Sequence, residues 1–379
     1  MELRYTREQE ELRRAVRHFA EQEIAPVVSN MEQQDEFPYS LISKMALKGF
    51  MGIPIPKQWN GAGADFISYI LAINEVSKIS AAVGVILSVH TSVGTFPILQ
   101  YGSAEQISKY VPKLASGESL GAFALTEPNA GSDAAAIRTS ALYDGEHYIL
   151  NGTKLFITNA DAANTYITFA VTDSAKGSHG ITAFIIERDT PGFKIGRREK
   201  KMGLHGSNTC ELIFDQLKVP VTQRLGVEGK GFSIAKGTLD GGRIGIGAQA
   251  LGIAEAALQE MDGLYPSVKK TGKRPKLLQH KHIRLAEMTA QVEAAKMLVY
   301  RAAYLRQNGL PCTKEASAAK MFASDTAVKV TNAAIELFGM EGCLKESNME
   351  RLFRDAKATQ IYEGTNEIHR IVISGQLLK

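Results

Sequence analysis

The spacing of apolar residues changes twice along this chain of 379 residues, and those changes restrict the folds open to it. In the first third, apolar residues recur every three or four positions, as on a helix with one buried face. From about Leu120 to about Pro220 they alternate instead, and the turn pairs Asp144-Gly145 and Asn151-Gly152 separate the runs, as between strands. Beyond Gly231 the helical spacing returns. The chain is therefore expected to be helical, then β, then helical.

Local signals place several of the helices. Thr6 and Gln9 form a capping box ahead of a helix that is expected to reach Pro26, and a second capping box begins at Ser103. Residues 81–99 are apolar on nearly every side, which predicts a buried helix. We expect an α+β protein with an N-terminal helical domain, a middle β domain and a C-terminal helical domain. The expected boundaries are 1–118, 119–226 and 227–379.

Composition and charge exclude several classes of function. The formal net charge is only +4, without the basic stripe that nucleic acid binding requires. Cys210, Cys312 and Cys343 lie far apart and without ligand spacing, so we expect neither a metal site nor a disulfide framework, and a cytoplasmic location. The N-terminus is too acidic for a transit peptide and lacks the apolar stretch of a signal peptide. No uncharged apolar run reaches the length that spans a bilayer, so no membrane partner is expected.

Four segments spread over the chain carry a specific resemblance. They are FALTEPNAGSD at 123–133, NGTKLFITNA at 151–160, TLDGGRIGIGAQALGIA at 238–254 and RDAKATQIYEGTNEIHR at 354–370. In this order and at these separations they resemble the acyl-CoA dehydrogenase family. The resemblance implies an N-terminal helical domain, a middle β-barrel domain and a C-terminal four-helix bundle. It also implies a homotetramer in which each FAD lies at a subunit boundary.

Glu363 lies in a YEGT motif, where such relatives carry their catalytic base. Dehydrogenation of an acyl-CoA needs a base for the proton α to the thioester carbonyl, an acceptor for the β-hydrogen, and stabilisation of the charge that grows on the carbonyl oxygen. Burial beside an apolar acyl chain and a flavin is expected to raise the pKa of Glu363 toward the working pH. The resemblance implies that the backbone N–H of Glu363 contributes to the oxyanion hole.

Some relatives carry the base instead at the position of Gly242, which cannot serve here, so Glu363 is the sole candidate. The pairing of YEGT with LDGGR resembles the butyryl-CoA dehydrogenases. Relatives that accept glutaryl-CoA have an Arg at the position of Gly84 that holds the distal carboxylate. A dicarboxylyl substrate is disfavoured here, because its second charge would be buried without a partner.

Further residues match the substrate and flavin sites of the family. Ser132, Asp240, Arg243 and Gly364 match positions near the substrate, although Asp240 and Arg243, taken alone, could also be ordinary charges on a helix surface. Phe156 stands where relatives often have Trp, and it keeps an aromatic face for the flavin ring. The full set of expected FAD contacts is Phe123, Leu125, Thr126, Ser132, Phe156, Thr158, Gln279, Thr365 and Glu367.

Three departures from the family pattern fall on the cross-subunit side of the FAD site. The usual RxxFG segment has Val268 and Thr271 in place of Arg and Phe, the usual QxxGG has Glu336 and Met340, and His205 replaces an Arg. An acid close to a pyrophosphate repels it, and the combined changes are expected to cost about 2 to 4 kcal/mol of FAD binding. The neighbouring cations either substitute for the lost Arg or form a solvated loop; they are Lys269, Lys270, Lys273 and Arg274.

The sequence thus predicts FAD-dependent dehydrogenation of a short-chain acyl-CoA, similar to butyryl-CoA, to the 2-enoyl-CoA. The resemblance implies that the electrons pass to an electron-transferring flavoprotein. One alternative is an acyl-CoA oxidase. No residue in this sequence distinguishes an oxidase from a dehydrogenase. The other is a paralogue that has lost flavin and only binds acyl-CoA or scaffolds a complex. The altered FAD site favours that second alternative, whereas the retained Glu363 opposes it, because a scaffold needs no base.

Overall fold

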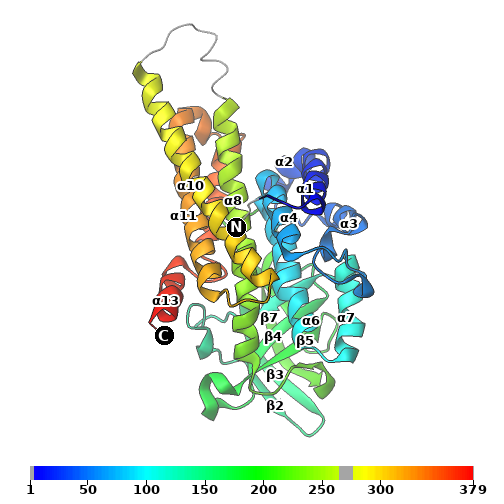
Figure 1. Ribbon diagram of the computed structural model, residues 1–379. Helices are drawn as coiled ribbons and strands as arrows, with labels where there is room; N and C mark the ends of the chain where they lie inside the picture. The colour runs from blue at the N-terminus through cyan, green and yellow to red at the C-terminus, as the bar shows by residue number, and fades with distance from the viewer. Residues whose placement is uncertain (1–3, 264–275, 379) are drawn as a thin grey trace.

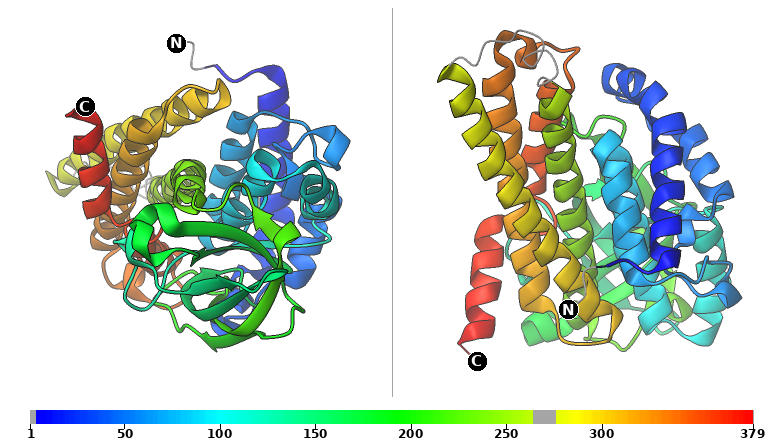
Figure 2. Two further views of the ribbon diagram at one scale, coloured as in Figure 1. Left: turned by 90° about the horizontal axis from the view of Figure 1, so that it is seen from below. Right: turned by 45° about the horizontal axis from the view of Figure 1, so that its top comes forward.

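A computed structural model describes residues 4–263 and 276–378 of the chain (Figure 1). Helices form the first part, a single sheet the second and long helices the third, so the expected α+β class and the order of its parts are confirmed. The predicted boundaries at 118/119 and 226/227 remain a proposal. Figure 2 shows the N-terminal helices and the long C-terminal helices standing over the sheet on either side of α8 (Gly231–Gly263).

The N-terminal part is built from helices that are short compared with the longest ones of the C-terminal part. They are α1 (Arg7–Phe19), η1 (Ala20–Ile24), α2 (Ala25–Gln34), α3 (Tyr39–Leu47), η2 (Phe50–Gly52), η3 (Lys57–Trp59), α4 (Phe66–Ile79), α5 (Ala81–Val89), η4 (His90–Thr95), α6 (Phe96–Tyr101) and α7 (Ala104–Ser116). The expected capping boxes begin α1 and α7, with side-chain and backbone bonds formed in both directions. Both predicted helix starts are therefore confirmed.

The sequence predicted that the first helix ends at Pro26, and this prediction is wrong. A π-helical turn, η1, interrupts the regular hydrogen-bond pattern before Pro26 is reached. Pro26 then falls in the first turn of α2, where its missing N–H removes no helical hydrogen bond. The helical path therefore continues to Gln34, and Asp35 ends it in the left-handed conformation.

The segment Ala81–Tyr101, which comprises α5, η4 and α6, is more apolar than we expected from the sequence. Its 21 residues are long and apolar enough to cross a membrane, which contradicts the earlier expectation, but 89% of its most apolar window is buried inside the molecule. At Gly94 it comes so close to β1 that an added Cβ would lie 2.8 Å from the carbonyl carbon of Gly121. The buried helix therefore packs directly on the strand that leads to Phe123 and Leu125.

The middle part is one eight-stranded sheet in the order β6-β7-β3-β2-β4-β5-β8, with β1 paired to β4. Its strands are β1 (Gly121–Ala124), β2 (Ser140–Tyr143), β3 (His147–Thr158), β4 (Thr165–Val171), β5 (Ile181–Glu187), β6 (Phe193–Arg198), β7 (Thr209–Pro220) and β8 (Arg224–Leu225), with the short helices η5 (Ala134–Ala136), η6 (Ser174–Gly180) and η7 (Val221–Gln223) between them. The family resemblance implied a barrel. Among the described residues β6 and β8 end the hydrogen-bonded path, so the pairing leaves the sheet open there.

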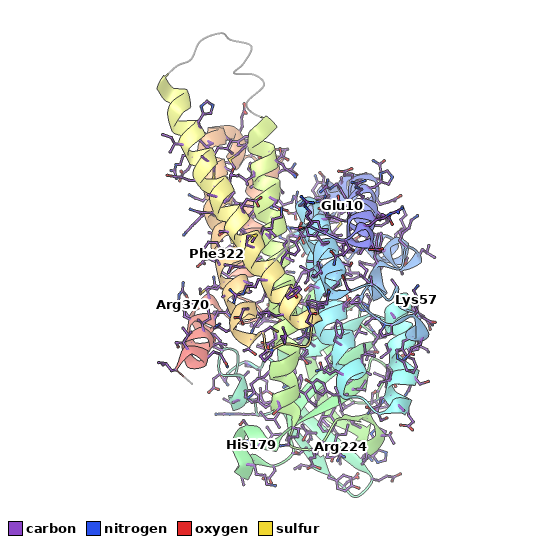
Figure 3. The ribbon with its side chains drawn as sticks, viewed as in Figure 1. Glu10, Lys57, His179, Arg224, Phe322 and Arg370 are labelled. Carbon is purple, nitrogen blue, oxygen red and sulfur yellow. The ribbon has the colours of Figure 1, made fainter. Side chains whose placement is uncertain are left out.

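The C-terminal part consists of α8, α10 (Lys276–Gln307), α11 (Thr313–Phe338), η8 (Gly339–Cys343), α12 (Asn348–Thr359) and α13 (Asn366–Leu377). The long helices α8, α10 and α11 pack together, and α8 also contacts α4 and α5 of the N-terminal part. The buried core runs without interruption from α1 to α12, with α8 at its centre. α13 lies at the outer edge of the molecule, where Figure 3 labels Arg370.

One buried carboxylate stabilises the packing of α1 on α4. Glu75 lies within 3.4 Å of Arg13, 2.9 Å of Arg17 and 3.1 Å of Lys78. Burial opposes its ionisation, but the hydrogen bond from Arg17 and the charges of Arg17 and Lys78 outweigh that effect and hold the pKa of Glu75 below its ordinary value. The stability that this ionisation contributes is therefore present above the ordinary Glu pKa and is lost as the pH falls through the folded-state value.

We predict that Glu75→Gln lowers the free energy of unfolding by about 2 kcal/mol at pH 7, because three cations lose their shared partner while two of them keep contact with water. The difference should shrink as the pH falls below 4. Thermal unfolding at several pH values measures both effects. Glu11→Gln, which breaks the exposed pair with Arg7 at 2.8 Å, is the control and should cost little. Equal losses in the two variants at pH 7 would contradict this account of Glu75.

Candidate active site

Glu363 lies on a short loop between α12 and α13. The loop, residues 360–366, is closed by a hydrogen bond from Asn366 N to Gln360 O at 3.1 Å. Glu363 has a φ of 55° and Gly364 a φ of 96°, so both adopt the left-handed region. That conformation is unfavourable for a residue with a side chain, and such residues cluster at functional sites. Contacts from the surrounding helices must therefore hold Glu363 in place.

The carboxylate of Glu363 is buried, although the residue as a whole is partly exposed. Its Oε2 has no hydrogen-bond partner among the described residues. Burial raises the pKa of Glu363 to about 7, against the opposing effect of the positive charges of Arg243 and Lys320. A carboxylate with this pKa can accept a proton near neutral pH, which is the property required of a general base.

α8 passes beside the Glu363 carboxylate at Gly242. An added Cβ at Gly242 would lie 2.7 Å from Glu363 Oε2 and 3.0 Å from Glu363 Cδ. Position 242 therefore faces the carboxylate directly, and a residue without a side chain leaves the space that Glu363 occupies.

Asp240 and Arg243 are both buried on α8, so they are not the helix-surface charges that the sequence left open. Arg243 Nη1 lies 3.2 Å from Asp240 Oδ1 and donates to Ser317 Oγ at 3.4 Å. Thr313 donates to the other Asp240 oxygen at 2.6 Å. Arg243 Nε is buried and has no partner among the described residues, so one donor of this group remains available to a ligand.

A cavity of about 720 Å³ opens beside Asp240. Its wall includes the rings of Phe66 and Phe96, and the guanidinium of Arg306 lies over both rings, at 5.5 Å and 5.9 Å from their centroids. The cavity thus combines an apolar wall with a cation and a carboxylate. It can hold a long ligand that is partly apolar and partly charged.

The residues expected at the flavin come from β1, from the loop after it and from β3. Phe123 lies on β1, Leu125 and Thr126 follow it, and Thr158 ends β3. Phe156 is 59% exposed and has a φ of 57°, in a β-bulge where the pairing of β3 with β7 shifts register. An exposed aromatic ring held in an unfavourable backbone conformation is suited to stack on a flat ligand, so these residues fit a flavin. Ser132 is exposed on the loop after β1, next to Gly131.

A buried ion pair, which we did not predict, ties the loop after β1 to β3. Lys154 is fully buried; its Nζ donates to Leu125 O at 3.0 Å and to Glu127 Oε1 at 2.8 Å. Burial lowers the pKa of Lys154 to about 8, and the charge of Glu127 opposes that shift. Glu127 also accepts from the backbone N–H groups of Arg138 and Thr139, at 2.6 Å and 2.9 Å. Lys154 and Glu127 stand within the motifs NGTK and TEP, which was the signal available in the sequence.

Thr365 and Glu367 lie at the first turn of α13, directly after the loop of Glu363. Thr365 is the N-cap residue, and its side chain accepts from Ile368 N at 3.4 Å. The helix has 12 residues, and its N-terminal N–H groups can interact with an anion such as a pyrophosphate. Of the remaining expected FAD contacts, Gln279 has its backbone in α10, and its side chain lies outside the described part of the chain.

The structure changes the interpretation of Glu336, which lies near the C-terminal end of α11. Its carboxylate is not a bare charge: Arg284 of α10 donates to it at 3.0 Å and Asn332 at 2.8 Å. The repulsion expected from the sequence is therefore partly neutralised within this chain. Met340, in η8, is 79% exposed. Val268, Thr271 and the cations Lys269, Lys270, Lys273 and Arg274 lie outside the described residues.

His205 belongs to a different polar cluster. Its Nδ1 lies 3.2 Å from Glu32 Oε2 and its Nε2 lies 3.1 Å from Lys201 O. Arg354 of α12 pairs with the same Glu32 at 2.9 Å. Within one chain, His205 and Glu336 therefore share none of the hydrogen-bond and ion-pair partners described here. Glu32 of α2 therefore joins His205 and Arg354 of α12.

Gly84, on α5, lies in close contact with α4. An added Cβ there would lie 2.0 Å from Ser77 Oγ, so α5 has no room at this position for the Arg that is expected to bind the second carboxylate of glutaryl-CoA. Across residues 4–263 and 276–378, no group of three or more His, Cys, Asp or Glu side chains is arranged to hold a metal ion. All three cysteines carry free thiols, and only Cys343 is exposed.

Comparisons with known proteins cover the whole molecule. Three family models match: the N-terminal domain of acyl-CoA dehydrogenase at residues 6–118, the middle domain at 122–217 and the C-terminal domain at 229–378. An acyl-CoA dehydrogenase of Bacillus subtilis is 57% identical over 98% of this chain and 98% of its own. The structure of butyryl-CoA dehydrogenase from Megasphaera elsdenii is 45% identical, with a TM-score of 0.95 over 100% of both chains. A chain in a structure of the electron transferring flavoprotein of Acidaminococcus fermentans gives the same identity, TM-score and coverage.

We predict that Gly242→Ala displaces the Glu363 carboxylate, because the new methyl group would lie 2.7 Å from Oε2. The substitution should lower the free energy of unfolding by about 1 to 3 kcal/mol, as overpacking does in other buried sites. A crystal structure and a thermal unfolding curve measure the two effects. The control is Gly241→Ala, whose Cβ would have as its nearest contact the end of the long Arg306 side chain, at 3.1 Å, and no backbone atom. If Glu363 keeps its position in Gly242→Ala, the contact between α8 and the Glu363 carboxylate is not tight.

Proposed function

The chain belongs to the acyl-CoA dehydrogenase family, oxidoreductases that act on the CH–CH group of acyl-CoA thioesters, and we propose that it dehydrogenates a short-chain substrate such as butyryl-CoA to the 2-enoyl-CoA. The observation that carries this proposal is the Glu363 carboxylate, which is buried against Gly242 and has its pKa raised to about 7. A surface glutamate or a residue of a scaffold has no reason to meet these conditions.

Glu363 serves in this proposal as the base. Its Oε2 has no competing hydrogen bond among the described residues, so a lone pair is free to take the proton from the α-carbon. The electron pair of the broken C–H bond delocalises onto the thioester carbonyl, and the backbone N–H of Glu363 is proposed to donate to that oxygen.

The family members are FAD-dependent flavoproteins, and the residues of β3 and of the loop after β1 described above fit that cofactor. Phe156, Thr158, Leu125 and Thr126 are proposed to hold the isoalloxazine, and Thr365 with the backbone N–H groups at the N-terminus of α13 the phosphate side. Glu367 is proposed to contact a part of FAD other than the pyrophosphate, which a carboxylate would repel. When bound, FAD supplies the acceptor for the β-hydrogen and its electron pair. The Lys154–Glu127 pair has a structural role, because it fixes the loop of Leu125 and Thr126 against β3.

A short acyl chain suits the apolar surface close to Glu363. Val85, Val89 and Val93 of the buried helix form a small separate core with Ile246, one turn beyond Gly242 on α8. Phe123 and Tyr362 pack against this core. A polar chain closes one side of it, because the Tyr362 hydroxyl donates to Gln249, which donates to Ala81 O at 2.7 Å. These side chains are proposed to line the acyl end of the site, and the solved relative acts, by its name, on butyryl-CoA.

The cavity beside Asp240 is the proposed path for the rest of the thioester. It adjoins α8 two residues from Gly242, and its wall carries both apolar rings and the Arg306 cation. The pantetheine arm is largely apolar with amide groups, and the nucleotide end is anionic. Asp240 and Arg243 are proposed to contact the arm, together with Ser132 and Gly364.

Partners and location are proposed from the comparisons and the surface. Electrons are proposed to pass to an electron-transferring flavoprotein, in line with the structural relative found with such a protein. A homo-oligomer, by family resemblance a tetramer, is supported by the apolar side chains that α13 exposes, with Ile371 65% and Leu377 67% exposed. A cytoplasmic location remains a prediction.

We predict that butyryl-CoA added anaerobically to the FAD-loaded protein bleaches the visible flavin band, and that Glu363→Gln abolishes the bleaching while it leaves butyryl-CoA binding nearly unchanged. The wild-type rate should rise as the pH rises through about 7, because only the ionised form of Glu363 is a base. The exposed Glu346→Gln is the control and should bleach normally. Bleaching by Glu363→Gln would refute the assignment of the base; failure of the wild type with flavin bound would refute the butyryl substrate.

Flavin affinity tests the revised view of Glu336. We predict that Arg284→Gln weakens FAD binding, because it frees the Glu336 carboxylate to repel the pyrophosphate, whereas Glu336→Gln strengthens it by less than tenfold. The double variant should bind FAD about as well as Glu336→Gln alone. Flavin retention after dialysis and fluorescence titration measure these affinities. If Arg284→Gln leaves the FAD affinity unchanged while Glu336→Gln raises it, the ion pair between Arg284 and Glu336 does not reduce the repulsion between Glu336 and the pyrophosphate.

A further inference from the structure

Lys320, on α11, is an unusual lysine. It is fully buried, yet among the described residues no carboxylate forms a salt bridge with it. Its Nζ donates instead to two neutral oxygens, Gly364 O at 2.7 Å and Asn366 Oδ1 at 3.1 Å. Lysine is almost never fully buried unless it is paired, so its position needs an explanation in terms of what it touches. Both oxygens belong to the loop that carries Glu363.

The same face of α11 holds both ends of that loop. Asn366 Nδ2 donates to Ser324 Oγ at 2.9 Å and to Asp325 Oδ1 at 2.8 Å. From the other end of the loop, Gln360 Nε2 donates to Asp325 Oδ1 at 2.6 Å. Lys320 and Ser324 are four residues apart and so lie on one side of the helix. Glu363 therefore sits between two anchors, and Lys320 is the one that bonds the residue directly after it.

The charged and titratable groups around this loop come from four helices and from the loop itself. They are Tyr69 on α4, Arg243 on α8, Lys320 and Asp325 on α11, Glu367, His369 and Arg370 on α13, and Tyr362 in the loop. Burial lowers the pKa of Lys320 to about 7, and the charges of Glu363 and then Asp325 oppose that shift. Burial lowers the pKa of His369 to about 3, so its ring stays neutral at working pH. Lys320 and Glu363 thus titrate in the same range, and each favours the charged form of the other.

We infer that Lys320 is a positioning residue for the base: it holds the Glu363 backbone in its left-handed conformation through the carbonyl of Gly364, and its ammonium charge acts on the Glu363 carboxylate. This inference rests on the proposed role of Glu363. The bond to the Gly364 carbonyl restrains the ψ of Gly364 and so the path of the backbone directly after Glu363. The ammonium charge stabilises the ionised carboxylate, which has no hydrogen bond of its own to Oε2.

A merely structural lysine would affect folding alone, so the test needs a readout that depends on charge. Lys320→Met removes the charge and the donor, Lys320→Gln keeps a donor without charge, and Lys320→Arg keeps both. In the anaerobic reaction with butyryl-CoA, we expect Lys320→Met to slow flavin reduction by about ten- to a hundredfold. The pH at which the rate rises should move upward in Lys320→Met and Lys320→Gln, because loss of a cation raises the pKa of Glu363. Lys320→Arg should keep the wild-type pH dependence. Lys329→Met, on the exposed face of the same helix, is the matched control.

A second measurement does not depend on any substrate. Because the folded-state pKa of Glu363 is raised, its ionisation costs stability above the ordinary Glu pKa, and Glu363→Gln should therefore raise the unfolding temperature at pH 7. That gain should be larger in the Lys320→Gln background than in the wild type. If it is equal in the two backgrounds, and if the pH dependence of flavin reduction is unmoved in Lys320→Gln, the inference is overturned. If butyryl-CoA fails to reduce the wild type, the proposed substrate fails, while the unfolding comparison still decides the role of Lys320.

Discussion

The close contact between α8 and the loop of residues 360–366 is the constraint on which the rest of the site depends. Gly242 brings the helix within reach of the Glu363 carboxylate, and no side chain could stand between them. The carboxylate loses its water there, and its proton affinity rises for that reason. The loop cannot hold this position by local preference, since Glu363 has a positive φ. The helices around it, above all α11, must supply the restraint.

The chemistry of the base is therefore a property of tertiary packing. The motif provides a carboxylate at the right place in the chain, but its pKa follows from the distance to α8 and from the cations Arg243 and Lys320. Glu363, Arg243 and Lys320 lie on three different elements: the loop of residues 360–366, α8 and α11. A change that loosened their packing would alter the proton affinity of Glu363 without touching the residue itself.

Much of the fold and the core of the site could be predicted from the sequence, because the relevant signals are local. The capping box at Thr6, the return of the helical period after Gly231 and the YEGT motif each lie within a few residues. What could not be predicted depends on partners far along the chain. Glu336 meets Arg284 across 52 positions, and Lys320 meets Gly364 across 44. Pro26 was misread because a proline in the first turn of a helix looks, in sequence, like one that follows its end. The buried pair of Lys154 and Glu127 was missed for a similar reason: each stood in a motif, but neither motif shows that the two side chains meet.

The apolar helix Ala81–Tyr101 has a consequence for how the protein is made. In the folded protein this segment packs against α8. α8 begins at Gly231, 130 residues after the segment ends at Tyr101. At usual rates of synthesis the segment leaves the ribosome roughly 7 to 26 seconds before α8 does. During that interval a stretch apolar enough for a bilayer is without its final partner. The nascent chain therefore carries exposed apolar surface, which favours aggregation, until the C-terminal helices have docked.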